Sequence, residues 1–460
     1  MKKYFKISLF ALLLSTLLVN SSCKKFSAFS KEHLTFSVDT LVFDTVFTTI
    51  GSTTQQFKIY NPSNRTINIE EVELMGGQNS HFRFNLDGVK GIYLKDIELA
   101  GKDSLFNFVE VTLDPNNQTL PMIVEDSIRF RTNGVDQYVK LTVWGQDAYF
   151  HYKDLNEGIW PNDKPHVIYG YAAVDSSKSL TIQAGTKIHL HKNSILYVYK
   201  GSLNVNGTLG NEVVFQGDRL EAMYDDVAGQ YYGIYFHQAL PSSIDYGIIK
   251  NGTVGVHLFG EDPSNMGYTL QIQNTKIFNV SRYGVFIYSG AKVKAENCII
   301  SKNQSHALLV LEGGDFNFNH CDLLGYGSAQ VPAVGISNYY NNGFTGVTNV
   351  GSINEGTLSN CVIYGNLEDE FALDTLQMAG VTLNFNFTHN LIKSSTTFND
   401  PFYTSIFWNQ DPMFVDLSQG DFIFQPNSDL NDNGVFSTTS LDYFGITRNN
   451  PPDIGAVEVN

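Results

Sequence analysis

The sequence predicts an all-β protein that begins with a β-sandwich and continues as a parallel β-helix with a C-terminal cap. Three observations support this fold class. A short pattern recurs through residues 244–393. Within it, apolar residues fall at every second place, which is the period of a strand rather than of a helix. The composition agrees, because 24 Tyr and 33 Phe favour strands and long amphipathic helical patterns are absent.

Each copy of the repeat begins with Asn or His and continues into an apolar strand. The copies start at Asn274, Asn297, His320, Asn360 and Asn390. The first three are 23 residues apart (297 − 274 and 320 − 297), a period typical of stacked repeats, and the longer later gaps predict insertions. Successive coils are expected to stack about 4.8 Å apart, so that equivalent residues form columns. Asn suits the turn because it tolerates left-handed backbone angles, and its amide can bond to the Asn above.

The cysteines of the repeat are expected to form one column, because Cys298, Cys321 and Cys361 each follow the repeated Asn or His. The favoured interpretation is a column of small buried thiols. A disulfide between stacked neighbours is an alternative in an exported protein. A metal site ranks third, because no column of histidines accompanies the cysteines.

Residues 1–22 have the pattern of a signal peptide: Lys2 and Lys3, an apolar run, and small residues before Cys23. The apolar run is too short to predict a membrane span. Ser21-Ser22-Cys23 resembles the lipid-attachment site of bacterial lipoproteins, although Asn20 stands where a branched apolar residue is usual. The resemblance implies an exported protein with a lipid on Cys23, anchored to the outer membrane on either face. The alternative is an ordinary cleaved signal peptide with a chance cysteine.

Residues 23–152 lack the repeat and alternate polar and apolar residues in short runs, which predicts a β-sandwich. Gly51 to Ile69, a strand, an Asn61-Pro-Ser-Asn turn and a second strand, resembles the immunoglobulin-like modules of bacterial envelope proteins. That resemblance implies a spacer or a binding module.

Residues 160–400 are predicted to form the β-helix. Gly185-Thr186 and Gly207-Thr208 end two strands 22 residues apart (207 − 185), and Val213 to Gly217 follow. These residues resemble the opening coils of secreted right-handed β-helix proteins of the pectate-lyase-like superfamily. Residues 401–460, with Asp411-Pro-Met-Phe and Pro452-Asp-Ile-Gly, resemble the tail of the same superfamily in Bacteroidetes-type proteins. The resemblance implies a right-handed helix, and we expect the tail to cap the open end of the stack.

The charge and the motifs exclude several function classes. The formal net charge of −16 repels polyanions, so nucleic acid is not an expected partner, and an acidic polysaccharide would need a local basic patch or a bridging cation. The sequence contains no Gly-rich phosphate loop, HExxH, GxSxG or paired CxxC. Asp429 to Gly434 fits half of a calcium loop, but Ser440 stands where the bidentate acid belongs, so we expect a turn and no cofactor, with a calcium site as the alternative.

Four charged residues are candidates for catalysis, because lyases on this fold use a basic residue on an outer sheet. We expect Lys250 and Lys302 in one column with Asn279 between them, and Arg282 in a nearby column with Glu368. The alternative is that all four are solvated surface charges.

A loop between residues 325 and 355 carries Tyr339, Tyr340 and Phe344, whose rings could stack on sugars. The alternative is that these rings pack the loop onto the helix. The leading hypothesis is a lipid-anchored envelope protein whose β-helix binds a polysaccharide or another envelope component, or acts as a scaffold, without catalysis. The competing hypothesis is a polysaccharide lyase or glycoside hydrolase on the same fold.

Overall fold

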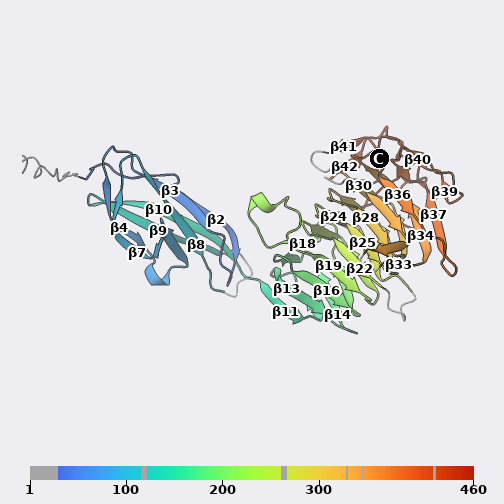
Figure 1. Cartoon of the computed structure of the whole chain (residues 1–460), viewed down its shortest axis with the longest axis horizontal. Coiled ribbons are helices and arrows are strands. Elements are labelled where there is room, and N and C mark those ends of the chain that lie inside the picture. The colour runs from blue at the N-terminus through green and yellow to red at the C-terminus, as the bar shows by residue number, and fades with distance from the viewer. Residues whose placement is uncertain are drawn as a thin grey trace, which may run out of the picture. The chain divides into compact units, whose positions relative to one another are not determined.

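The computed structural model describes residues 29–115, 122–260, 267–327, 330–343, 346–417 and 421–459. The chain divides into two compact units between Gln146 and Asp147 (Figure 1). None of the helical segments in these ranges has the length and hydropathy needed to span a bilayer.

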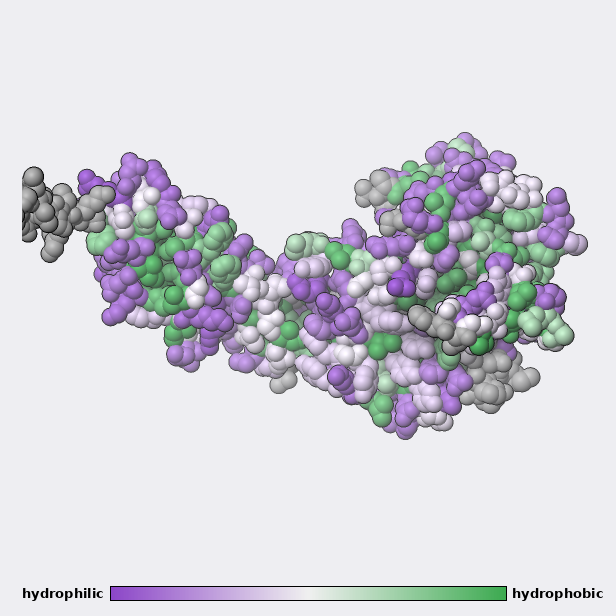
Figure 2. All heavy atoms as spheres, in the orientation of Figure 1, coloured by the Kyte–Doolittle hydropathy of each residue, from purple (hydrophilic) through white to green (hydrophobic). Residues whose placement is uncertain are grey.

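The first unit is a β-sandwich whose two sheets share one hydrophobic core. Strand residues alternate between this core and solvent, as in β5, where Phe82 and Phe84 are buried and Arg83 is exposed. In Figure 2, hydrophobic residues gather in the middle of the visible face of this unit, with hydrophilic residues around them. One sheet has the order β1 (Thr35–Phe36), β3 (Gln55–Tyr60), β8 (Ser104–Val111), β5 (Phe82–Leu86) and β6 (Val89–Gly91). The other has the order β2 (Thr40–Phe47), β10 (Val135–Gln146), β9 (Met122–Thr132), β4 (Ile67–Leu74) and β7 (Tyr93–Leu99).

The second unit is a parallel β-helix, as the sequence predicted, and its coils have three faces (Figure 1). Parallel pairing begins at Tyr149, and β11 (Tyr149–Leu155) and β13 (His166–Val174) each run along face 3 and then face 1. Face 1 continues through β16 (Ile195–Tyr199), β19 (Gly233–His237), β22 (Val256–Phe259), β25 (Val285–Tyr288), β28 (Leu308–Leu311), β31 (Val334–Ser337) and β36 (Phe371–Asp374).

Face 2 comprises β12 (Gly158–Trp160), β14 (Ser179–Gln183), β17 (Ser202–Asn206), β20 (Ser242–Asp245), β23 (Leu270–Gln273), β26 (Lys292–Glu296), β29 (Asp315–Asn319), β34 (Ile353–Ser359), β37 (Leu383–Thr388) and β39 (Tyr403–Thr404). Face 3 comprises β15 (Lys187–Leu190), β18 (Val213–Gly217), β21 (Gly247–Lys250), β24 (Lys276–Phe278), β27 (Ile299–Ser301), β30 (Asp322–Gly325), β35 (Val362–Gly365), β38 (Leu391–Ile392) and β40 (Phe407–Trp408). The short helices are η1 (Gly77–Asn79) and η2 (Ala222–Tyr224).

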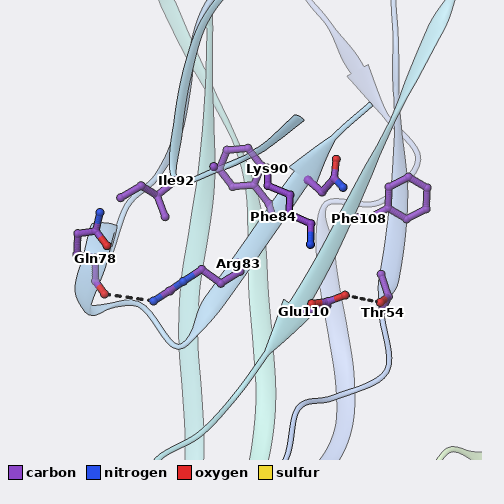
Figure 3. Close-up of a pocket in the computed structure, with 10 residues that line it drawn as sticks. Thr54, Gln78, Arg83, Phe84, Lys90, Ile92, Phe108 and Glu110 are labelled. Carbon is purple, nitrogen blue, oxygen red and sulfur yellow. Dashed lines mark hydrogen bonds between the residues drawn. The ribbon is translucent and has the colours of Figure 1, made fainter. Parts of the chain in front are cut away.

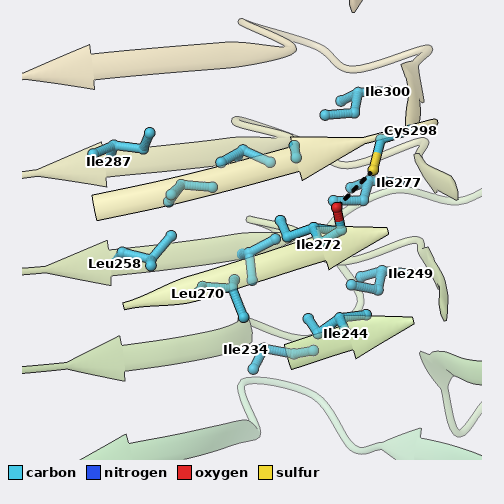
Figure 4. Packing of buried hydrophobic residues seen from close by; sticks show 14 of the residues in the cluster. Ile234, Ile244, Ile249, Leu258, Leu270, Ile272, Ile277, Ile287, Cys298 and Ile300 are labelled. Carbon is cyan, nitrogen blue, oxygen red and sulfur yellow. Dashed lines mark hydrogen bonds between the residues drawn. The ribbon is translucent and has the colours of Figure 1, made fainter. Parts of the chain in front are cut away.

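Inward side chains of the three faces fill the helix with one continuous core. Ile249 pairs with Ile277, and Ile277 with Ile300, so that these side chains stack one above another (Figure 4). Leu258 and Ile287 stack in the same way on face 1. Burial of such columns is the main favourable contribution to folding, at about 25 cal/mol for each Å² of apolar surface removed from water.

The predicted asparagine ladder is present at the turn between faces 2 and 3. Backbone φ is positive at Asn274, Asn297, His320 and Asn360. Asn297 Nδ2 donates to Asn274 Oδ1 at 3.1 Å, and Asn360 Nδ2 lies 3.1 Å from His320 Nε2. These bonds satisfy amide groups that the stack buries.

The fifth copy of the ladder was predicted wrongly by one residue. Val362 pairs with Leu391, so that His389, with φ of 51°, takes the position of Asn360. Asn390 is fully buried, and its Oδ1 accepts a hydrogen bond from the Cys361 backbone N–H at 2.8 Å. Whether the ladder position falls on residue 389 or on residue 390, Asn390 stands beside the same apolar strand. The sequence pattern alone could not distinguish these two registers.

Cys298, Cys321 and Cys361 are free thiols buried in the core, which confirms the favoured interpretation. Their Sγ atoms donate to the carbonyls of Glu296, Asn319 and Ser359, two residues before each cysteine. Burial raises the pKa of Cys298 and of Cys321 well above the ordinary value. The thiols of Cys298 and Cys321 are therefore protonated, inaccessible and unreactive.

The C-terminal residues cap the end of the stack only in part. Phe402, Tyr403 and Trp408 belong to the last coil, β39 and β40, and pack against the end of the core. The rest of the described tail, which includes β42 (Asp421–Phe424) after β41 (Phe414–Asp416), packs instead along the outside of face 3, where β27, β30, β35 and β38 present apolar outward side chains. The buried Asp322 stands among them and accepts a hydrogen bond from the Ala456 backbone N–H at 3.2 Å. This lateral cluster comprises Ile299, Leu324, Val362, Leu391, Phe422, Phe424, Leu430, Tyr443, Ile454 and Ala456.

Candidate functional site

Two neighbouring outward columns of face 1 are aromatic in β16, β19, β22 and β25, and we call their side chains the aromatic ladder. All of these side chains are half-buried. In chain order, the ladder comprises Tyr197, Tyr199, Tyr235, His237, His257, Phe259, Phe286 and Tyr288.

The rings of the ladder largely cover one another. The Tyr235 and His257 centroids are 4.4 Å apart with planes 15° apart, and those of His257 and Phe286 are 4.7 Å apart with planes 21° apart. Near-parallel rings one coil apart cover each other's faces. Such ring contacts stabilise the fold by more than the burial of their apolar area alone. The middle of the ladder therefore presents mainly ring edges to a ligand.

The two histidines of the ladder are neutral at pH 7. Burial lowers the pKa of His257 to about 4, and burial together with Lys200 lowers the pKa of His237. Burial also raises the pKa of Tyr235 to about 12 and raises that of Tyr197. The Tyr197 hydroxyl is hydrogen-bonded to His237 Nδ1 at 2.7 Å, which holds the Tyr197 ring in one orientation.

A cavity of about 380 Å³ lies where the ladder begins, and we call it the tyrosine pocket. Ala173 of the preceding coil pairs with Tyr197, and its methyl group is too small to cover the Tyr197 ring. The residues that line the pocket include Leu155, Tyr171, Ala173, Asp175, Tyr197 and Tyr199. The pocket is therefore the place where the ladder offers a ring face, beside one carboxylate.

The predicted column of Lys250 and Lys302 is wrong by one residue. Lys250 pairs with Phe278, and Phe278 pairs with Ser301. Lys302 is thus the next residue along the chain, with φ of 53°, at the turn that follows β27. Because neighbouring strand residues point to opposite sides, a slip of one residue separates two side chains that a sequence alignment places together.

Arg282 and Glu368 each precede a face 1 strand at the same offset, but they are not neighbours. Between their strands, Val285 pairs with Leu308, Leu308 with Val334, and Val334 with Phe371. Three coil steps of about 4.8 Å put them about 14 Å apart. Both are exposed. The structure therefore does not bring the four charged candidates together.

The predicted aromatic loop is a hairpin of β32 (Tyr339–Asn342) and β33 (Val347–Val350). Tyr339 donates its hydroxyl to Asp374 Oδ2 on β36 at 2.6 Å, which ties the hairpin to face 1. Tyr340 is 40% exposed. Phe344 and the lipidation candidate Cys23 both lie outside the described residues.

The half-calcium loop is held by bonds within the tail. The Asp432 backbone N–H donates to Asp453 Oδ1 at 2.7 Å, and Asn433 Nδ2 donates to the carbonyl of Asp429 at 3.2 Å. Across the described ranges, no three His, Cys, Asp or Glu side chains are grouped to hold a metal ion.

The aromatic ladder is the feature that the sequence analysis missed. In Val256-His257-Leu258 and Val285-Phe286-Ile287, the inward residues define the strand and the residue between them is aromatic. An aromatic residue at the outward place of successive copies was the available signal. Recognising the ladder from this signal required the pairing register, which places His257 beside Phe286.

Comparison with known families supports the fold. A family model described as a right-handed β-helix region matches residues 168–323. With the parallel pairing of the three faces, this shows a right-handed parallel β-helix, as predicted. No curated protein sequence matches the chain significantly.

Solved structures give only distant likenesses. XylC in complex with xylose has 9% sequence identity and a TM-score of 0.33, over 91% of this chain and 89% of that chain. A family 123 glycoside hydrolase from Clostridium perfringens has 4% identity and a TM-score of 0.17, over 25% of this chain and 26% of that chain. A GH87 α-1,3-glucanase catalytic unit from Streptomyces thermodiastaticus strain HF3-3 has 10% identity and a TM-score of 0.18, over 76% of this chain and 64% of that chain.

Proposed function

We propose that the β-helix unit binds a neutral glycan without transforming it, with one sugar ring seated against Tyr197 in the tyrosine pocket. The observation that carries this proposal is the aromatic pocket itself. Its volume of about 380 Å³ falls in the range of small-molecule sites, which are lined mainly by apolar and aromatic side chains with few polar groups.

The lining suits a pyranose. The apolar C–H face of the sugar packs on the uncovered side of the Tyr197 ring, while Leu155, 68% exposed, borders the same pocket. Asp175, at the polar side of the lining, accepts hydrogen bonds from sugar hydroxyls. The bond from Tyr197 to His237 holds the ring in place before the ligand arrives, which reduces the entropy lost on binding.

A binding role accords with the charged candidates better than a catalytic role does. A general acid and base must act on the same bond, within hydrogen-bond reach of the reacting atoms. Arg282 and Glu368 are three coil steps apart, and Lys250 and Lys302 do not share a column. These four residues therefore give no support to the lyase or hydrolase alternative.

The test is isothermal titration calorimetry of the whole chain with neutral oligosaccharides of gluco, manno and xylo configuration. We expect at least one to bind, and Tyr197→Ala to weaken that binding about tenfold or more, the equivalent of 1.4 kcal/mol. Tyr152→Ala is the matched control, because Tyr152 is 58% exposed and does not line the pocket. Unchanged affinity in Tyr197→Ala, or release of reducing ends or unsaturated products, contradicts the proposal.

Membrane attachment through Cys23 and the immunoglobulin-like character of the sandwich are also proposals, which rest on the sequence resemblances. Incorporation of labelled palmitate into the native chain but not into Cys23→Ser tests the first, and equal labelling of both chains excludes Cys23 as the site. The hairpin is proposed as a second glycan contact through Tyr339, Tyr340 and Phe344. This second contact predicts that Tyr340→Ala also weakens binding of the glycan.

A further inference from the structure

A cavity in the sandwich unit forms a second candidate site, which we call the sandwich pocket (Figure 3). Its volume is about 690 Å³, and strands β5, β6 and β8 of one sheet supply most of its lining. The residues used in the following argument are Thr54, Arg83, Asn85, Lys90, Phe108 and Glu110.

Two cations line this pocket without carboxylate partners. Arg83 donates through Nη1 to the Phe82 carbonyl at 2.6 Å and through Nη2 to the Gln78 carbonyl at 3.4 Å, so that backbone oxygens hold its guanidinium (Figure 3). Within the part of the chain that the structure describes, neither Arg83 nor Lys90 forms an ion pair. With the one carboxylate of the lining, that of Glu110, the two cations leave the pocket with a small positive charge on a protein whose net charge is −16.

A buried amide oxygen in the pocket also lacks a partner. Asn85 Oδ1 is buried and accepts no hydrogen bond. Asn85 lies opposite Phe108 on β8 and opposite Lys90 on β6. Buried acceptors are nearly always satisfied in folded proteins, so an unpaired one beside a cavity calls for a donor from outside the chain.

The remaining lining adds an apolar surface and one carboxylate, that of Glu110, which lies opposite Arg83 in the pairing of β5 with β8. The Phe108 ring is half-buried and stacks on Phe106 with centroids 6.0 Å apart. Glu110 Oε1 accepts a hydrogen bond from the Thr54 hydroxyl at 2.8 Å, which orients the carboxylate (Figure 3). The pocket thus combines two cations, an unsatisfied acceptor, an aromatic ring and a positioned carboxylate.

We propose that the sandwich pocket binds a uronic acid residue of a glycan. The sugar carboxylate pairs with Lys90 and Arg83, a sugar hydroxyl donates to Asn85 Oδ1, and the C–H face of the ring lies on Phe108. Glu110 accepts from a second hydroxyl. This site goes beyond the proposed function, because it lies in the other unit and takes a charged sugar where the tyrosine pocket takes a neutral one.

The experiment titrates the whole chain at low salt with a trimer of uronic acid residues and with its methyl ester, followed by calorimetry. We expect the trimer to bind and the uncharged ester to bind about tenfold more weakly, since charge-assisted hydrogen bonds are roughly twice as strong as neutral ones. Lys90→Gln weakens trimer binding about three- to fivefold, as expected for an exposed ion pair. The matched control is Lys95→Gln, an exposed lysine on β7 of the opposite sheet, which leaves the affinity unchanged.

Asn85→Ala separates a ligand site from a structural role. Because Asn85 Oδ1 has no bond to lose, the variant keeps the melting temperature of the native chain while trimer affinity falls. A lower melting temperature with unchanged affinity overturns the proposal, as does equal affinity for trimer and ester or the absence of saturable binding. Tyr197→Ala distinguishes the two sites: it leaves uronate binding intact, and loss of uronate binding in that variant places the ligand in the tyrosine pocket and overturns the proposal.

Discussion

Single amide side chains join the coils of the β-helix to one another and to the tail. Asn360 is fully buried, and its Nδ2 donates to Asn319 Oδ1 at 3.1 Å and to the Val435 carbonyl at 3.0 Å. Its Oδ1 accepts from the Val435 backbone N–H at 2.7 Å. One residue of the repeat therefore closes a coil and also holds the C-terminal segment against the side of the helix.

Asn360→Ala is expected to lower the free energy of unfolding of the β-helix by about 2–4 kcal/mol, because buried donors and acceptors around it lose their partners. Urea denaturation followed by circular dichroism measures the change. Asn349→Ala is the control, since Asn349 is exposed on β33, and we expect a change within about 0.5 kcal/mol. Equal losses in the two variants would show that the ladder bonds contribute nothing specific.

Within a strand, side chains point alternately into the core and outward, and this alternation determines which surface each residue belongs to. In β28, Leu308 points into the core and is fully buried, and Leu309 points outward and is half-buried. Leu309 pairs with Phe286 at the end of the aromatic ladder. Two neighbouring residues of the same type thus belong to two different surfaces.

Leu308→Ala is predicted to destabilise the unit by about 3–5 kcal/mol, because it leaves a cavity in a core that cannot collapse around it. Leu309→Ala removes the same atoms from the outward side, and we expect a loss of about 1 kcal/mol or less. Chemical denaturation of both variants tests the pairing register directly. A larger loss of unfolding free energy in Leu309→Ala than in Leu308→Ala would mean that Leu309, and not Leu308, faces the core.

The coils and their strands also explain why part of the architecture could be predicted from the sequence. The period of the copies from Asn274 to His320 reflects the length of one coil, so stacking, the asparagine turn and the cysteine column were predictable. The columns of Lys250 and Asn390 were each misplaced by one residue, because Val362 pairs with Leu391 and Lys250 with Phe278. Variable coil lengths make such slips invisible in a pattern of alternating apolar residues.

For the whole molecule, buried neutral histidines make stability depend on pH. Burial lowers the pKa of His166 to about 4 and that of His257 to about 4, from 6.5 in the unfolded chain. The unfolded state takes up these protons first, so the stability they contribute is full above pH 6.5 and is lost as the pH falls toward 4. Asp322 acts in the opposite direction: burial raises its pKa from 3.8 to about 7, so its contribution is full below pH 3.8 and is lost as the pH rises through 7.

His257→Phe isolates one of these contributions, because Phe286 occupies the same column one coil later and shows that the ring fits. We expect the loss of unfolding free energy between pH 7 and pH 4.5 to be smaller in the variant by about 2 kcal/mol, at about 1.4 kcal/mol per pH unit with a discount for partial exposure. The lost bond to the Tyr232 hydroxyl affects both pH values alike and cancels. A parallel pH profile in the two proteins contradicts a neutral His257.

Coil length and strand alternation are local properties that a repeat displays, so the amino-acid sequence was enough to predict a sandwich followed along the chain by stacked β-coils. The contacts between side chains of different coils became known only from the folded structure. Leu155, Ala173 and Tyr197 form one pocket wall from three successive coils, and Val435 reaches Asn360 across 75 residues. Such contacts depend on the exact register and on which side of the helix the tail covers. A shift of one residue reverses every side chain of a strand, and so the fold was predictable from the pattern while the site was not.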